Sequence, residues 1–222
     1  ASIRLLNRLG VQVVTPENAG CCGAISHHLG KADAAKQFAR ANIAAWSGGG
    51  YDAIIVTASG CGTQIKDYAH LLRNDPAIAQ DTANVSGITR DLSEFLSQLE
   101  LPAPAHRPSL RVAYHAACSA QHGQKITGKA EALLRHAGFD VLTPRDAHLC
   151  CGAAGSYTLL QPEMSERLAA RKAENLAALK PDVIATGNIG CQLQIAAAQT
   201  PVLHWVQLLD WAYGGPRPEG VG

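Results

Sequence analysis

The stretch PDVIATGNIGCQLQI (181–195) decides the fold, because it joins an apolar run to a glycine, a cysteine and a helix-like continuation. The run DVIATGN (182–188) is nearly continuous in apolar residues, which is typical of a strand buried on both faces of a parallel sheet. A second stretch, YDAIIVTASGCGTQI (51–65), repeats this order, so Cys61 and Cys191 each follow an expected strand. Ligands of open parallel sheets bind beyond the carboxyl ends of the strands, so both cysteines are candidate site residues.

The two halves of the chain repeat one another. LLNRLGVQVVTPENAGCCGA (5–24) matches LLRHAGFDVLTPRDAHLCCGA (133–153), and all matched anchors lie 128 to 130 positions apart. Such a narrow spread of spacings indicates duplication. Short β-rich runs alternate with helical segments in each half, which predicts an α/β fold with parallel sheets. We therefore expect two duplicated Rossmann-like halves related by a pseudo-two-fold axis.

The expected elements follow from local composition. Strands are expected at 11–16, 110–115 and 139–144, in addition to the two runs above, and helices at 31–46, 92–96, 162–179 and 206–212. Three prolines in LPAPAHRPS predict a linker between the halves. The expected domains are a first repeat at 1–101 that is truncated at its N-terminus, a proline-rich linker at 102–109, a second repeat at 110–213 and a tail at 214–222.

Composition excludes several classes of function. The chain has 222 residues, 47% hydrophobic residues and a net charge of +1, so no charge imbalance suggests nucleic acid as a partner. No apolar run approaches the ~20 residues of a membrane span. No signal peptide is visible, which predicts a cytoplasmic protein. The chain opens without an initiator Met, on what reads as the middle of a helix, and we interpret it as part of a longer protein.

Seven cysteines, an odd number, argue against a disulfide framework and favour metal binding. Cys118, Cys150, Cys151 and Cys191 of the second half would meet if the strand ends converge, and four thiolates suit either zinc or an iron–sulfur cluster. The first half offers Cys21, Cys22 and Cys61. The partner of Cys118 would lie about eleven residues before Ala1 by the repeat spacing, so we expect the first site to be incomplete in this chain.

Four histidines lie near these cysteines, namely His27, His28, His115 and His148. Each could be a ligand, a hydrogen-bond donor to sulfur or a surface residue. We favour a supporting or structural role over ligation, because the thiolates already meet the ligand count. The sequence contains no nucleophile–base pair, and its glycine-containing stretches lack the strand–GxGxxG–helix context of a dinucleotide site.

The repeated CCG motif resembles the cysteine-rich CCG domain of heterodisulfide reductase subunits, lactate-utilisation proteins and the iron–sulfur subunits of glycolate oxidase and anaerobic glycerol-3-phosphate dehydrogenase. The stretches GCCGAISHHLG, ASGCGTQIKDYAHLL, HLCCGAAGSYTLLQPEM, ATGNIGCQLQI and LLDWAYGG look most like the C-terminal part of the glycolate oxidase iron–sulfur subunits. In that family a ferredoxin-like region precedes the domain, and its cysteine runs are missing from this chain. The fuller family pattern ends in C-x-x-C, whereas Gln64 and Gln194 stand here, which argues against a five-cysteine cluster.

The resemblance implies an iron–sulfur electron-transfer subunit that passes electrons from a flavin-containing partner, which oxidises glycolate or a related 2-hydroxy acid, towards quinone. It implies a [4Fe–4S] cluster, no catalysis by this chain alone, and association with the inner face of the membrane only through the complex. Two alternatives remain open, a zinc-stabilised docking module and a thiol-redox catalyst like the heterodisulfide-reducing relatives. Whether this piece of the protein retains metal is a matter for elemental analysis.

Overall fold

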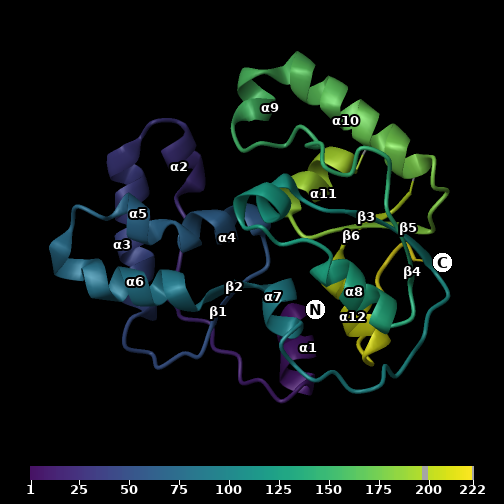
Figure 1. Ribbon diagram of the computed structural model, residues 1–222, viewed down its shortest axis with the longest axis horizontal. Helices are drawn as coiled ribbons and strands as arrows, with labels where there is room; N and C mark the ends of the chain where they lie inside the picture. The colour runs from purple at the N-terminus through teal and green to yellow at the C-terminus, as the bar shows by residue number, and fades with distance from the viewer. Residues whose placement is uncertain (197–199, 222) are drawn as a thin grey trace. The chain divides into compact units, whose positions relative to one another are not determined.

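The computed structural model describes residues 1–196 and 200–221 (Figure 1). The chain divides into two compact units. The larger unit comprises Ala1–Val13 and Ser93–Gly222, and the smaller unit comprises Val14–Leu92. Within the described residues, every helix is too short or too polar to cross a membrane.

A four-stranded parallel sheet forms the centre of the larger unit. Its strands lie in the order β4-β3-β5-β6, with bounds Asp140–Leu142, Arg111–His115, Val183–Thr186 and Val202–His204. In the register of the two central strands, His115 is the partner of Thr186. All four residues of β5 are buried, as expected for a strand covered on both faces. The carboxyl ends of β3, β4 and β5 therefore point the same way.

Helices cover this sheet on both sides. In Figure 1, α9, α10 and α11 lie on one side of the sheet, and α8 and α12 lie on the other. Pro162 is the first residue of α10, where its missing N–H costs no helix hydrogen bond. The helices of this unit are α1 (Ser2–Arg8), α7 (Leu92–Leu96, which begins at the unit boundary), α8 (Lys129–His136), α9 (Tyr157–Leu160), α10 (Pro162–Ala177), α11 (Ile189–Ile195) and α12 (Trp205–Ala212), with a π-helical turn at Ser119–Gly123.

Charged groups hold α1 against α12. The Asp210 carboxylate is 1% exposed and accepts hydrogen bonds from Arg4 Nη2 at 2.7 Å and Arg8 Nη1 at 3.0 Å. Near the C-terminal end, the Arg217 guanidinium lies 5.3 Å from the centre of the Trp211 ring. The first helix of the chain therefore packs with the C-terminal part of the sequence. The larger unit therefore combines elements from both ends of the chain.

The smaller unit is built around two short parallel strands, β1 (Ile54–Val56) and β2 (Thr89–Asp91). Its apolar core includes Ile43, Ile65 and the ring of Tyr68, and Cys22 lies at the edge of this core. Its helices are α2 (Ala24–His28), α3 (Ala32–Trp46), α4 (Ser59–Lys66), α5 (Tyr68–Leu71) and α6 (Ala79–Ile88), with a 3-10 turn at Pro76–Ile78.

The mixed α/β class with parallel sheets is confirmed, and most of the expected elements form. The strand expected at 11–16 is wrong, because these residues have no regular structure and Val14 is 52% exposed. β-branched residues favour a strand only where a neighbouring strand and a buried face are available. The corresponding run at 139–144 does form a strand, β4, because β3 pairs with it.

Candidate metal centre

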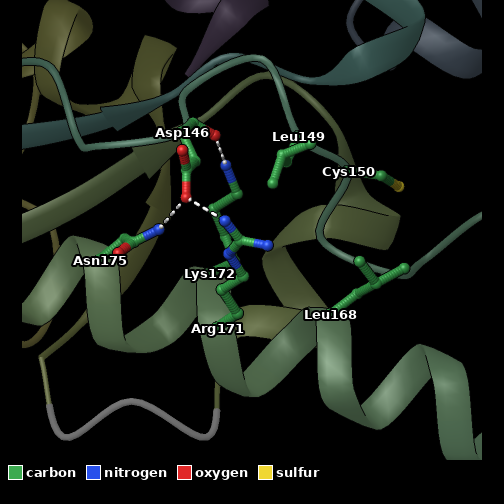
Figure 2. Close-up of a pocket in the computed structure, with 7 residues that line it drawn as sticks. All are labelled: Asp146, Leu149, Cys150, Leu168, Arg171, Lys172 and Asn175. Atoms are coloured by element: carbon green, nitrogen blue, oxygen red, sulfur yellow. Dashed lines mark hydrogen bonds and ion pairs between the residues drawn. The ribbon is translucent and has the colours of Figure 1, made fainter.

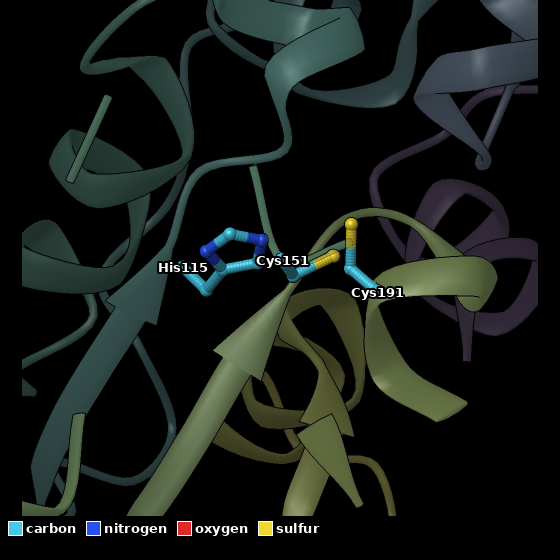
Figure 3. A group of neighbouring side chains, drawn as sticks. All are labelled: His115, Cys151 and Cys191. Atoms are coloured by element: carbon cyan, nitrogen blue, oxygen red, sulfur yellow. The ribbon is translucent and has the colours of Figure 1, made fainter. Parts of the chain in front are cut away.

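The larger unit brings four cysteines together beyond the ends of its strands. Cys118 follows β3, the pair Cys150 and Cys151 lies in the loop after β4, and Cys191 lies in the first turn of α11, which follows β5. The Sγ atoms of Cys118 and Cys150 are 3.8 Å apart. The sulfur atoms of Cys151 and Cys191 and a ring nitrogen of His115 lie within 4.8 Å of one another (Figure 3).

Hydrogen bonds among these thiols shift their pKa values in opposite directions. The Cys118 thiol donates to Cys150 and lowers the pKa of Cys150 to about 2, while the same contact raises the pKa of Cys118. Cys151, placed between two acceptors, has a raised pKa because it donates to Cys150 and Cys191. The pKa of Cys191 is lowered to about 5, mainly by the hydrogen bond from Cys151 and to a smaller extent by the neighbouring His115 ring. A bound metal ion would displace the thiol protons and bind thiolates.

A glycine permits the tight turn of the CCG motif. Gly152 has φ +90°, and a Cβ atom here would clash with the backbone oxygen of Ser165 in α10. The Gly152 N–H donates to Cys150 Sγ at 3.3 Å. The Ser165 hydroxyl donates to the Gly152 carbonyl at 3.1 Å and accepts from Gln194 Nε2 at 2.9 Å. Helix α10 therefore fixes the turn that carries two of the four thiols.

Helix α10 also holds the loop that precedes the motif, through Asp146 (Figure 2). Lys172 Nζ donates to the Asp146 carbonyl at 2.7 Å, and Arg171 Nη2 donates to its carboxylate at 2.6 Å. Asn175 adds a longer bond to the same carboxylate. The Arg171 guanidinium lowers the pKa of Asp146. Lys172 is 1% exposed, and its burial lowers its pKa, although the nearby thiolates favour its charged form.

The smaller unit brings its three cysteines together in a similar turn. Cys22 is 7% exposed and accepts from the Cys61 thiol, which lowers the pKa of Cys22 to about 6 and raises that of Cys61. Cys21 is exposed and also contacts Cys22. The Gly23 N–H donates to Cys21 Sγ at 3.4 Å, as the glycine of the other CCG turn does to its own first cysteine.

A buried asparagine holds this turn. Asn42 is fully buried in α3, where its Oδ1 accepts from the Gly20 N–H at 2.8 Å and its Nδ2 donates to the Cys21 carbonyl at 2.9 Å and to the Tyr68 hydroxyl at 3.0 Å. The Tyr68 hydroxyl in turn donates to the Cys22 carbonyl at 2.9 Å. The Asn42 amide therefore binds the backbone of the turn and a side chain that also holds it, Tyr68.

The sequence did not reveal the residues that support the thiols. Asn42, Ser165 and Lys172 lie on expected helices, where each looks like an ordinary polar position of an amphipathic helix.

The histidines near the cysteines make different contacts. His27 Nδ1 lies 3.2 Å from Gln64 Oε1, and the rings of His27 and His28 stack with centres 6.0 Å apart. The His148 backbone oxygen contacts the His122 ring.

The donor set suits a thiolate-bound metal. Four sulfur atoms from three segments of the chain meet in the larger unit, and thiolates are the ligands that zinc and iron–sulfur clusters prefer. The glycine of the CCG turn keeps the neighbouring backbone free of a Cβ atom that would obstruct it.

The cysteine-rich CCG domain model matches residues 1–66 and 112–196, a span that includes every cysteine described above. This chain belongs to the CCG cysteine-rich domain family. The resemblance expected from the CCG motifs is therefore confirmed.

Individual relatives give the same picture. The chain is 40% identical to the glycolate oxidase iron-sulfur subunit of Escherichia coli (strain K12) over 96% of its own length and 53% of that protein. It is 31% identical to the probable glycolate oxidase iron-sulfur subunit of Bacillus subtilis (strain 168), over 88% of this chain and 45% of the relative. It is 29% identical to lactate utilization protein A of Geobacillus thermodenitrificans (strain NG80-2), over 88% of this chain and 82% of the relative. The chain spans about half the length of the first two relatives.

Proposed function

We propose that this chain is the cysteine-rich part of an iron–sulfur electron-transfer subunit of a glycolate or related 2-hydroxy-acid oxidase. The main observation behind the proposal is that four cysteines lie close together beyond the carboxyl ends of the parallel strands, namely Cys118, Cys150, Cys151 and Cys191. Relatives of this CCG family chain are iron–sulfur subunits, which supports an iron–sulfur cluster as the group held there. We take a [4Fe–4S] cluster as its form, since the larger unit offers four thiols.

The chain's own residues would hold and surround the cluster. The four cysteines would be its ligands, and α10 would fix the turn that carries Cys150 and Cys151. The bound cluster would accept and pass on single electrons. The buried ammonium of Lys172 would partly balance its negative charge, which favours the reduced form. Substrate chemistry would belong to another subunit, which the iron–sulfur subunit names of the relatives support.

The partner would be a flavin-containing subunit that oxidises the 2-hydroxy acid, and the acceptor would be quinone. The name of the Escherichia coli relative, a subunit of glycolate oxidase, supports such a complex. The ferredoxin-like region expected from the resemblance would supply further clusters. We place the complex in the cytoplasm, at the inner face of the membrane, with this chain attached only through its partners.

We further propose that the two CCG turns derive from one duplicated Rossmann-like unit with a pseudo-two-fold relation. Gly23 and Gly152 both have positive φ, and each N–H donates to the first cysteine of its motif. Asn42 and Lys172 occupy matching positions, and each donates to a backbone carbonyl in or before its turn. The first-half ligands would be the three clustered cysteines Cys21, Cys22 and Cys61 together with an upstream cysteine.

A zinc-stabilised docking module is the second candidate, and one distance favours it. Tetrahedral zinc with Zn–S bonds of about 2.3 Å places two sulfurs about 3.8 Å apart. The Sγ atoms of Cys118 and Cys150 have this separation, 3.8 Å. A thiol-redox role is the third candidate, because the same pair of sulfur atoms could form a disulfide.

Visible absorption separates these functions. The protein purified under anaerobic conditions should be coloured, and dithionite should bleach the broad absorption of the cluster. A colourless protein with stoichiometric zinc would favour the docking module. A colourless, metal-free protein in which oxidation reversibly removes two thiols would favour the thiol-redox role.

A further inference from the structure

His115 is buried beside the thiols, and its ring is unsatisfied. It is 1% exposed, and neither ring nitrogen has a hydrogen-bond partner among the described residues. Burying an imidazole without hydrogen-bond partners is costly, because each nitrogen loses its bond to water and gains none in return. His115 is the last residue of β3, one of the two central strands, and Cys118 follows three residues later. The fold thus places an imidazole at the site and leaves both of its nitrogens available.

The ring faces sulfur rather than a protein oxygen. One of its nitrogens lies within 4.8 Å of the Sγ atoms of both Cys151 and Cys191, and all three side chains are buried (Figure 3). On the adjacent strand β5, Thr186 is the register partner of His115, and its hydroxyl is also buried without a hydrogen bond. Unpaired polar groups therefore lie together at the carboxyl ends of β3 and β5, which is typical of a site that a bound ligand completes.

We infer that His115 is a nitrogen ligand of the metal centre, together with Cys151 and Cys191. This inference rests on the proposed function, since it concerns the group held at the same site. The ligands then form two sets, a buried set of one imidazole and two thiols, and the half-buried pair Cys118 and Cys150. Five protein donors exceed the four of a tetrahedral zinc ion, so the arrangement suits a centre with more than one metal atom.

The other candidate for an additional donor on the neighbouring helix is already engaged. Gln194 follows Cys191 by one helical turn, but its Nε2 donates to Ser165 Oγ at 2.9 Å and to the Ser165 carbonyl at 3.4 Å. That amide therefore serves the CCG turn. The ring nitrogens of His115, by contrast, have no hydrogen-bond partner among the described residues. A neutral imidazole in place of a thiolate raises the reduction potential of an iron–sulfur centre, as histidine ligation does in Rieske centres.

The test uses the whole chain, reconstituted with iron and sulfide under anaerobic conditions and labelled with ¹⁵N-histidine. Pulsed EPR of the paramagnetic state should show the strong hyperfine coupling of a directly bound histidine nitrogen. This measurement needs no variant, so it does not depend on whether a substitution at His115 folds. Only weak coupling from a remote nitrogen would overturn the inference and would indicate a hydrogen bond to sulfur instead.

Variants give a second readout that does not depend on the spin state. His115→Leu should lose iron to a chelator at least tenfold faster than the wild type, whereas His136→Leu, at an exposed histidine of α8, should match the wild type. His115→Cys should keep the iron and lower the midpoint potential. Unchanged iron retention in His115→Leu would overturn the inference and leave the proposed function intact. A wild type that takes up no iron would overturn both.

Discussion

Asn42→Ala should destabilise the smaller unit, because Asn42 ties the first CCG turn to α3. The side chain is fully buried and makes three hydrogen bonds, to the Gly20 N–H, the Cys21 carbonyl and the Tyr68 hydroxyl. At about 1 kcal/mol net for each bond, the loss comes to about 3 kcal/mol. Water can reach the backbone of Gly20 and Cys21, which are exposed, and the buried Tyr68 hydroxyl keeps its bond to the Cys22 carbonyl, so the larger penalty for fully unpaired buried groups does not apply.

Asn84→Ala is the matched control, because it makes the same substitution inside a helix, α6, of the same unit. Asn84 is exposed and only accepts a bond from Gln80. Both variants gain the same helix propensity, so the difference between them isolates the buried bonds. Urea denaturation of the metal-free, reduced protein measures the free energy of unfolding, and amide hydrogen exchange reports the smaller unit separately. A difference below about 1 kcal/mol between the two variants would refute the reasoning.

Three further predictions concern the thiols and their turns. Gly152→Ala should cost more than about 2 kcal/mol in thermal or urea unfolding, because its Cβ would meet the backbone of α10, whereas Gly155→Ala, with open space around it, should cost about 1 kcal/mol; equal losses would contradict the close packing. In the metal-free protein, the free energy of unfolding of the wild type relative to Cys61→Ala should grow from about pH 6 to pH 9, because the Cys61 thiol lowers the pKa of Cys22 to about 6, and should shrink above pH 9, because the pKa of Cys61 is raised; a flat difference across this range would show that the two thiols do not share a proton. Cys151→Ser should remove more iron than Cys22→Ser, because it breaks a set of four thiols rather than three, and metal analysis showing equal losses would contradict that ranking.

The sequence was informative where a pattern is local or repeated. The helices at 31–46 and 162–179 appear as α3 and α10, and the cysteines gather as the positions of the strand ends implied. Parallel strands share one carboxyl edge, so the order of strands and cysteines was sufficient for that expectation. The strand expected at 11–16 failed because pairing depends on a neighbour that local composition does not describe.

The supporting polar groups could not be found in this way. Asn42 and Lys172 look like ordinary polar positions on amphipathic helices, and only the packing of each helix against its CCG turn gives them partners. His115 was assigned a supporting role because the thiols already met the ligand count. Its burial and its unpaired nitrogens, which only the fold reveals, are the reason to treat it as a ligand.

The most direct test of the central claim is the iron, sulfide and zinc content of the anaerobically purified protein, compared with that of Cys150→Ser/Cys151→Ser. The two substitutions remove the adjacent donors of the larger unit and leave the cysteines of the smaller unit in place. We predict iron and acid-labile sulfide in similar molar amounts in the wild type, and the loss of most of both in the double variant. Zinc without sulfide in the wild type, or an iron and sulfide content that the double variant leaves unchanged, would contradict an iron–sulfur centre at this site.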